Sequence, residues 1–446
     1  MSTGAEKSEP EIADALAETA GAAAAVAGAV GAGDAAPPAS VPAPEKAALD
    51  LAEAEKVLAL PQLLKAISER YEKPLQKIVT EIARLSFGRG KVATEEYFTL
   101  RLFDDANIVG EKSAFAGMKG MRDVWIEANY NSHWFGPMSD KLAFDTLIGG
   151  FGLPVIRTRA YYSADQNVRS LNMLRTPEAL SAFLKDPASY PFFGKPKSSS
   201  LSLGSASAVA YEAEGDLVRL QNGKSIPLAQ LVREIVANFG SGYLFQERVK
   251  PHEGVRAICG ERIATVRLYT LNGKSGPKVF RGVWKIPAGR NMADNFWRKG
   301  NILAAFDYES GAITRAITGF ALDQKELSHH PDTGHPLVGA VIPNFEEVVA
   351  LALDGARVFS EIPLIGWDIA PTDEGGVIVE GNFAPDFKLV QMAERRGILD
   401  AELAAFLEES RAAHKAHKAE SKRKIKEFAR DDMKKFVKGS GLRKKA

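Results

Sequence analysis

Apolar residues between positions 46 and 85 recur every three or four residues, the spacing that places them on one face of a helix. That face consists of Leu64, Ile67, Tyr71, Leu75, Ile78 and Ile82. Because proline lacks a backbone N–H and clashes with the preceding turn, Pro74 predicts a kink or break. Residues 90–135 have a mixed pattern. We predict a helical N-terminal region over residues 46–135, whose role the pattern does not indicate.

A further helix is predicted from Asp140 to Gly152. Asp140 is a typical N-cap, because its carboxylate can accept hydrogen bonds from the free N–H groups of the first helical turn. The residues expected to face inward are Leu142, Thr146, Leu147 and Ile148. Residues 153–158 then predict a strand.

Between residues 192 and 387, short apolar stretches alternate with turn signals. Asn222-Gly223 and Asn272-Gly273 are typical two-residue hairpin turns. Strands are predicted over residues 243–246, 279–286, 302–308 and 313–318, and helices over residues 227–239 and 345–359. Antiparallel strands with helices set between them indicate an α+β fold rather than a doubly wound parallel sheet.

Residues 366–382 predict a hairpin that carries acidic residues inside apolar strands. If its five-residue polar loop is symmetric about Glu374, Asp368 lies opposite Glu380, with Cβ atoms about 4.5–5.5 Å apart. Asn382 shares a strand face with Glu380, because side chains alternate along a strand. Two carboxylates this close repel unless a cation lies between them, and an all-oxygen set favours Mg²⁺. The alternative is a solvated acidic face.

Composition excludes several classes of protein. Residues 1–45 contain 16 Ala and 5 Pro and almost no large apolar side chains, which predicts disorder. The apolar run at residues 21–33 follows acidic residues, where a secretory signal needs positive charge, and no stretch of about 18 strongly apolar residues occurs. We therefore expect a cytoplasmic protein without a membrane span. The single cysteine, Cys259, excludes an intrachain disulfide, and we expect a structural role for it.

The residues best suited to hold phosphate groups surround Lys195, which ends an apolar strand. The serine-rich loop that follows, residues 198–207, offers hydroxyl and backbone N–H groups to phosphate oxygens. No G-x-x-x-x-G-K-[ST] motif occurs, and the glycines at residues 149–152 are badly placed for a dinucleotide turn. By itself, a serine-rich loop is more often only a surface loop.

In order and approximate spacing, several of these residues resemble the ATP-grasp superfamily. The resemblance covers about residues 135–395 and is carried by Lys141, Lys195, Gln246-Glu247, Arg267 and Asp368…Glu380-x-Asn382. Asp294-Asn295-Phe296-Trp297 and the Gly-Trp-Asp…Glu-Gly-Asn block are most similar to the sugar-transfer-associated ATP-grasp branch. One departure is the loop after Lys195, where Gly204 is the only glycine and many ATP-grasp proteins have several.

The resemblance implies two α+β subdomains, residues 136–250 and 251–400, that grip ATP and Mg²⁺. It implies phosphate contacts from Lys141 and Lys195, and from the loop residues Ser202, Gly204 and Ser205. It implies that Glu247, Arg248 and Val249 lie beside the nucleotide base, that Arg267 and Asn295 face the γ-phosphate or an acyl phosphate, and that Asp368, Glu380 and Asn382 hold one or two Mg²⁺ ions.

These implied roles predict a ligase. A carboxylate attacks the γ-phosphate of ATP, and an amine, thiol or similar nucleophile captures the acyl phosphate. Phosphoryl transfer needs positioning and charge neutralisation more than covalent help. The expected partners are therefore ATP and a carboxylate-bearing substrate. The alternative is a non-ligating nucleotide-binding protein, such as a scaffold or sensor in polysaccharide biosynthesis.

Two further features allow more than one interpretation. Lys285 interrupts an apolar strand, and it either contacts substrate or faces solvent. His329, His330 and His335 cluster in a segment rich in turn residues, whereas zinc ligands usually come from separate elements, which argues against a zinc site.

The net charge of +1 conceals a strong asymmetry. Residues 411–446 contain 14 Lys and Arg against 4 Asp and Glu, a net charge of +10, so residues 1–410 carry −9. We predict a basic helical tail over residues 401–446. Such tails either bind nucleic acid or an acidic surface or are simply solvated; only Phe428 and Phe436 are available here for base stacking.

Overall fold

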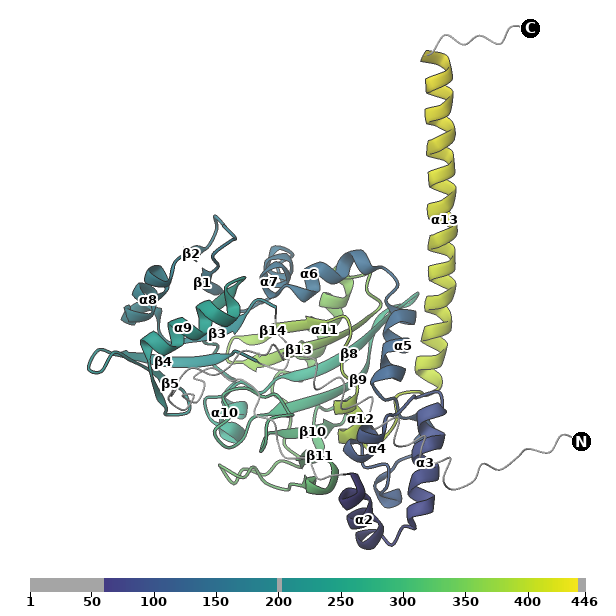
Figure 1. Ribbon diagram of the computed structural model, residues 1–446, viewed down its shortest axis with the longest axis horizontal. Coiled ribbons are helices and arrows are strands. Elements are labelled where there is room, and N and C mark those ends of the chain that lie inside the picture. Colours follow the sequence, from purple (N-terminus) through teal and green to yellow (C-terminus); the bar gives the residue numbers. More distant parts are fainter. Residues whose placement is uncertain (1–59, 199–202, 440–446) are drawn as a thin grey trace, which may run out of the picture. The chain divides into compact units, whose positions relative to one another are not determined.

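The computed structural model describes residues 60–198 and 203–439, with side chains as far as Arg430 and at Asp432. Within these residues the chain forms two seven-stranded sheets with helices packed on them, which confirms the predicted α+β class (Figure 1). The predicted disordered segment, the predicted site residue Ser202 and the end of the tail lie outside the described residues.

The first sheet has the strand order β2-β1-β7-β3-β4-β5-β6. Its strands are β1 (Thr158–Tyr162), β2 (Asn172–Leu174), β3 (Phe192–Pro196), β4 (Ala206–Glu212), β5 (Leu217–Leu220), β6 (Ser225–Pro227) and β7 (Tyr243–Glu247). All neighbours pair antiparallel except β1 and β2. Helices α8 (Pro177–Lys185) and α9 (Leu228–Phe239) contribute apolar residues to the core of this sheet.

The second sheet has the order β12-β11-β10-β9-β8-β13-β14 and is antiparallel throughout. Its strands are β8 (Val266–Gly273), β9 (Gly276–Ile286), β10 (Ile302–Phe306), β11 (Ile313–Thr318), β12 (Lys325–Glu326), β13 (Leu364–Thr372) and β14 (Gly375–Asn382). Helix α11 (Phe345–Val358) packs on one face, where Leu268 and Trp284 lie. The opposite face, with Tyr269 and Leu271, packs on α12 (Lys388–Glu394) and on the N-terminal helices. Both faces are covered, so central strands read as continuous apolar runs without alternation.

The remaining helices are α2 (Leu60–Arg70), α3 (Leu75–Phe87), α4 (Thr94–Thr99), α5 (Met118–Ala128), α6 (Phe135–Ser139), α7 (Lys141–Gly150), α10 (Glu253–Cys259) and α13 (Ala401–Gly439). Short 3₁₀ turns occupy Asp105–Asn107, Lys112–Ala114, Ser132–Trp134, Pro187–Ser189 and Ala321–Asp323. The break at Pro74 is confirmed, since α2 ends before it and α3 begins directly after it. The subdomain boundary at residue 250 stays a prediction.

Several local predictions need correction. Residues 153–157 form no strand; β1 begins only at Thr158, and this stretch contributes a single bridge from Val155 to Ile378. Pro154 offers β14 a carbonyl but no N–H, which limits pairing. The hairpin between β8 and β9 exists, but Asn272 and Gly273 belong to β8, and the turn lies at residues 274–275.

Helix α7 begins as predicted, because the Asp140 carboxylate accepts hydrogen bonds from the N–H groups of Leu142 and Ala143. Its inward face was predicted only in part: Ile148 is buried and Leu147 packs against the core, but Phe144 and Asp145 were not predicted. The buried residues are Phe144, Asp145 and Ile148, whereas Thr146 is exposed. In a short helix, the periodicity does not determine which of two neighbouring faces turns towards the core. Here the stacking of Phe144 on Phe359 determines it.

Helix α13 has two dissimilar parts. Its first three turns bury Leu403, Phe406 and Leu407 against the core shared with α5. Further along, Ile425 and Phe428 are 68% and 70% exposed. Among the described helices, none combines the length and apolar character that a membrane span requires. A partner for the basic part stays a prediction.

Asn129 joins the N-terminal helices to the second sheet. Its Nδ2 donates to the carbonyls of Leu364 (2.8 Å) and Phe383 (2.6 Å), and its Oδ1 accepts from the N–H of Leu364 (2.8 Å). The residue is 4% exposed. An Asn129→Ala variant leaves these backbone groups unsatisfied, and each such buried group costs about 1–3 kcal/mol. We expect the free energy of unfolding in urea to fall by roughly 3 kcal/mol. Asn131→Ala, which removes surface hydrogen bonds, is the control; equal losses would contradict the prediction.

Candidate active site

A cavity between the two sheets is lined by residues of both. Lys141, Phe193, Lys195, Ser205 and Glu247 belong to the part of the chain that contains the first sheet. Ile263, Lys285, Asp294, Asp368 and Glu380 belong to the second. Of the predicted site residues, the cavity is lined by Lys141, Lys195, Ser205, Glu247, Arg248, Val249, Asp368 and Glu380. Gly204, Arg267, Asn295 and Asn382 do not line it, and Ser202 is outside the described residues.

The acidic hairpin has the predicted register, because Asp368 pairs directly with Glu380. The turn, however, is not the predicted five-residue loop. Thr372 pairs with Gly375, so only Asp373 and Glu374 form the turn. With this turn alone, Asp368 would pair one residue away from Glu380. A β-bulge between Ile378 and Glu380 inserts one extra residue and restores the pairing. The predicted pair was therefore correct although the predicted turn was wrong.

Asp368 forms the centre of an ionic row that crosses four strands. On β8, Arg267 stands opposite it and donates from Nε (2.7 Å) and Nη2 (2.5 Å) to its two carboxylate oxygens. On β9, Lys285 donates to Oδ2 at 3.0 Å. On the other side, β14 presents Glu380. Burial alone would raise the pKa of Asp368, but the two cations outweigh burial and lower the pKa to about 2. Asp368 is therefore ionised at neutral pH.

The sequence left open whether Lys285 contacts substrate or faces solvent. It does not face solvent; it is 7% exposed and lies within the cavity wall, between Asp368 and Asp294. Sequence reasoning missed Asp294 and chose its neighbour Asn295. Asp294 lines the cavity and accepts from the N–H (2.8 Å) and hydroxyl (2.5 Å) of Thr265. The only signal for it was its place in the Asp-Asn-Phe-Trp block.

Asn295 and Asn382 have other surroundings. The Oδ1 of Asn295 accepts from the N–H of Trp297 at 3.2 Å, within the loop that follows β9. Asn382 ends β14, and its Nδ2 is buried without a hydrogen-bond partner among the described residues. The assignment of oxygen and nitrogen in an amide follows from its partners, so an amide with an unsatisfied end can turn its oxygen towards a ligand.

Lys195 is the most unusual group in the cavity. It is 6% exposed, and its ammonium makes no hydrogen bond or ion pair with any described residue. Burial lowers its pKa, although Asp145 and Glu380 are near enough to act in the opposite direction. A buried cation without a bonded partner is costly, so this position favours an anionic ligand.

Asp145, on the buried face of α7, is a second titratable group that the sequence did not indicate. Its Oδ2 accepts from Nε2 of Gln246 at 2.8 Å. Burial raises its pKa to about 6 despite the opposing charges of Lys195 and Lys141. The charge of this carboxyl therefore changes close to neutral pH, beside the two lysines.

Gly204, in the loop after Lys195, has a backbone conformation and close neighbours that require glycine. Its φ of +76° is in the left-handed region, and a Cβ at this position would lie 2.3 Å from the Phe239 ring. Its carbonyl accepts from the buried Tyr243 hydroxyl at 2.9 Å. The one glycine of the loop is therefore required by backbone geometry.

The end of the cavity at the linker between the sheets is apolar. Ile156, Val249, Ile263 and Val379 form it, a set suited to a flat heterocycle. At its edge, Oε1 of Glu247 accepts from Arg157 (3.3 Å) and Arg159 (3.4 Å).

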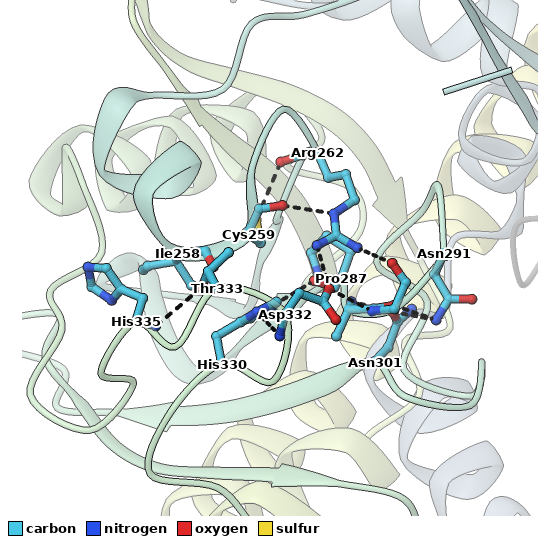
Figure 2. Close-up of polar contacts among 12 residues, drawn as sticks. Ile258, Cys259, Arg262, Pro287, Asn291, Asn301, His330, Asp332, Thr333 and His335 are labelled. Atoms are coloured by element: carbon cyan, nitrogen blue, oxygen red, sulfur yellow. Dashed lines mark hydrogen bonds and ion pairs between the residues drawn. The ribbon is translucent and has the colours of Figure 1, made fainter. Parts of the chain in front are cut away.

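The loop between β9 and β10 carries Met292, Ala293 and Asp294 into the cavity and is held by the network in Figure 2. Within the loop, the fully buried Asn301 accepts from the N–H of Ala288 (3.0 Å) and donates to the carbonyls of Ala293 (2.9 Å) and Asn295 (2.7 Å). These bonds hold the backbone on both sides of Asp294 in place.

Outside the loop, Arg262 donates to the carbonyl of Gly289 (2.8 Å) and to Asp332 (2.9 Å), as Figure 2 shows in part. His330 is 1% exposed and bonds the carbonyl of Pro287 through Nε2 at 3.0 Å. His330 thus supports the start of the loop, whereas His329 and His335 bond residues of their own segment. The described residues contain no group of three or more His, Cys, Asp or Glu side chains arranged for a metal.

Two sheets that enclose a cavity with lysines at one wall and an Asp–Glu pair at the other define an ATP-grasp arrangement. The family described as sugar-transfer associated ATP-grasp matches residues 121–406, well over half of the sequence. The chain belongs to this family.

The solved structures similar to this chain include ATP-grasp enzymes. The D-alanine-D-alanine ligase from Coxiella burnetii has 14% identity and a TM-score of 0.38, with 66% of this chain and 62% of that chain covered. The D-alanine-D-alanine ligase from Bacillus anthracis complexed with ATP has 12% identity and a TM-score of 0.34, with coverage of 63% and 69%. The N5-carboxyaminoimidazole ribonucleotide synthetase from Thermotoga maritima has 9% identity and a TM-score of 0.30, with coverage of 60% and 49%.

The chain thus spans about three fifths of the length of the first of these structures. A comparison with curated protein sequences finds no significant match.

The raised pKa of Asp145 predicts a pH-dependent stability. Below about pH 4 the carboxyl is protonated in both states; between pH 4 and 6 it ionises in the unfolded chain but keeps its proton in the fold. Stability contributed by this group is therefore lost as the pH rises through 6, by about 3 kcal/mol at 1.4 kcal/mol per pKa unit. Asp145→Asn does not show this loss. The difference in free energy of unfolding between the variant and the wild type should therefore shift by about 3 kcal/mol in favour of the variant between pH 4 and 7, measured by urea unfolding.

Asp165→Asn, on an exposed loop, is the matched control. A constant difference between Asp145→Asn and the wild type across this pH range would contradict the assignment.

Proposed function

We propose that the protein is an ATP- and Mg²⁺-dependent ligase that activates a carboxylate as an acyl phosphate for capture by an amine, thiol or similar nucleophile. The observation that carries this proposal is the buried ammonium of Lys195, which lines the cavity and has no bonded anion among the described residues. An anion placed here would replace the hydration that burial removes. The triphosphate of ATP supplies such an anion.

The ends of the cavity suit the two ends of a nucleotide. The apolar side chains around Val249 would cover the base, and the backbone of Arg248 and Val249 offers hydrogen-bonding groups beside it. Lys141 and Lys195 would bind the phosphates, with Ser205 of the loop next to them. The position of Lys141 is set by its place in the first turn of α7, where Asp140 caps the helix.

The residues around Asp368 fit Mg²⁺. Asp368 and Glu380 form an oxygen-rich pair on adjacent strands, and the unsatisfied amide of Asn382 ends the same strand as Glu380. Oxygen ligands together with substrate phosphates are the usual environment of this ion in proteins. When bound, Mg²⁺ would neutralise charge on the phosphates and orient them.

The chain's own cations would act on the transferred group. Arg267 and Lys285 are held in place by Asp368, so their charges are oriented before substrate arrives. Preorganised charges of this kind stabilise a transition state without further reorganisation. We propose that Lys285, and Arg267 behind it, stabilise charge on the γ-phosphate, and that Asp294 restrains Lys285. Asn295 would contribute through the loop that positions Asp294.

A non-ligating sensor would use the same nucleotide site. The two functions separate in an ADP-release assay with pooled carboxylates and amines, because a sensor binds ATP without releasing ADP. Sustained Mg²⁺-dependent ADP release that requires a carboxylate supports the ligase.

Lys195→Met should change affinity and stability in opposite directions. The loss of a charge that pairs with phosphate in a buried site costs about 2–5 kcal/mol, so ATP should bind roughly 30-fold or more weakly in calorimetry. Without nucleotide, the free energy of unfolding should not fall, because burial of the ammonium without a bonded partner among the described residues is costly. Lys185→Met, at the exposed end of α8, is the control. Unchanged ATP affinity in Lys195→Met would contradict the proposal.

The two acids of the hairpin should behave differently when neutralised. Asp368→Asn leaves Arg267 and Lys285 without their carboxylate and should cost about 3–5 kcal/mol of stability. Glu380 is only half-buried, so Glu380→Gln should fold normally while Mg²⁺-dependent ADP release falls at least about 100-fold, the lower end for loss of a group that stabilises the transition state. The measurements are urea unfolding and ADP release for both variants. Full activity of Glu380→Gln would exclude its role at the metal.

A further inference from the structure

A second cavity, which is cationic, lies away from the candidate active site and shares no lining residue with it. It has a volume of about 290 Å³, at the lower end of ligand sites. Three arginines from separate elements line it: Arg101 in the turn after α4, Arg315 on β11 and Arg395 at the end of α12. Figure 1 labels these three elements.

Two of these guanidinium groups are fixed by the fold. Arg315 donates from Nε to Glu326 (2.7 Å) and from Nη1 to the carbonyls of Met392 (2.9 Å) and Ala393 (3.0 Å). Arg101 donates from Nη2 to Asp104 (2.7 Å) and from Nη1 to the carbonyl of Gln324 (3.2 Å). The cavity wall is therefore preorganised at these two positions.

Donors remain unused on the same wall. Among the described residues, Nη2 of Arg315 has no acceptor, and the half-buried Arg395 side chain makes no hydrogen bond or ion pair at all. Its neighbour Arg396, by contrast, is exposed and pairs with Asp400 at 3.5 Å. A guanidinium has five N–H donors, so Arg395 alone offers a complete fork to an oxyanion.

Charges around the cavity are not balanced. The cations Arg101, Arg315, Lys325 and Arg395 face two carboxylates, Asp104 and Glu326, which leaves a net charge of +2. Burial lowers the pKa of Arg315, and the nearby charges of Arg395 and Arg101 lower it further. Arg315 is thus close enough to Arg101 and to Arg395 to be repelled by both, and a dianion between them would relieve that repulsion.

We propose that this cavity is a phosphate-binding site, for inorganic phosphate or the phosphate group of a small phosphate monoester. A phosphate carries about −1.5 to −2 charges at pH 7, which matches the charge of the cavity, and its oxygens match the guanidinium fork. The ligand would join the turn after α4, in the N-terminal helical region, to β11 and α12. This inference is independent of the proposed ligase reaction.

Arg395 offers a variant that should not harm the fold. Its φ is +58°, a left-handed conformation that asparagine tolerates better than arginine. Arg395→Asn therefore removes the free guanidinium and retains the backbone. Arg396→Asn, one residue further along and outside the cavity, is the matched control.

The experiment is calorimetric titration of the full chain with inorganic phosphate, glycerol phosphate and succinate, a dianion of different geometry. Phosphate should bind the wild type and Arg396→Asn equally and Arg395→Asn at least tenfold more weakly, and succinate should bind at least tenfold more weakly than phosphate. A Lys195→Met background removes phosphate binding at the nucleotide site, so the two sites are measured separately. Tighter binding of glycerol phosphate than of inorganic phosphate would identify the ester as the ligand, and the reverse would identify the free ion.

Three results would overturn the proposal: no phosphate binding by the wild type in the Lys195→Met background, equal binding by Arg395→Asn, or equal affinity for succinate. The unfolding midpoint of Arg395→Asn should match or exceed that of the wild type, which separates loss of a ligand contact from loss of the fold.

Discussion

The structure around the candidate active site depends on one buried carboxylate. Asp368 is 3% exposed in the middle of β13, where an unpaired charge would be intolerable. Arg267 and Lys285 compensate it from β8 and β9, so three strands must keep their register for the charges to meet. The ion pairs add little net stability, since desolvation offsets much of their attraction, but they hold two cations in fixed positions. Preorganisation of charge at the cavity wall follows from the cost of burying Asp368.

The second sheet can hold such a row because both of its faces are covered. Helix α11 covers one face, and the N-terminal helices with α12 cover the other, so the central strands are shielded from water. Within the part of the chain that the structure describes, Lys195 is buried and has no bonded partner, whereas Arg315 is fixed by two carbonyls and an acid and leaves one donor group unused. Both arrangements favour phosphate groups, one through a buried charge and the other through free guanidinium donors.

The sequence predicted the hairpin pair, the cap of α7, the break at Pro74 and the α+β class, because each depends on neighbours within a few residues. The pairing of Asp368 with Glu380 shows the limit of such reasoning. Symmetry about Glu374 predicted the correct partners, although the turn lies elsewhere and a bulge corrects the register. The resemblance to ATP-grasp proteins extended these local patterns to a family, which the match over residues 121–406 confirms. It did not identify Lys285 or Asp294 as parts of the cavity, or Asp145 as a titratable group near its lysines.

Alone, the sequence determined most of the helices and strands and which residue types could bind phosphate and metal, since periodicity is a local property; two turns and one strand it placed wrongly. Only the tertiary structure decided which charges are paired. Lys195 and Lys285 look alike as lysines in apolar strands, yet one has no bonded partner and the other is held by two carboxylates. Arg395 and Arg396 are consecutive, yet one lines a cavity and the other pairs at the surface. The physical reason is that the free energy of a charge depends on burial and on neighbours brought from distant positions, which no local pattern contains.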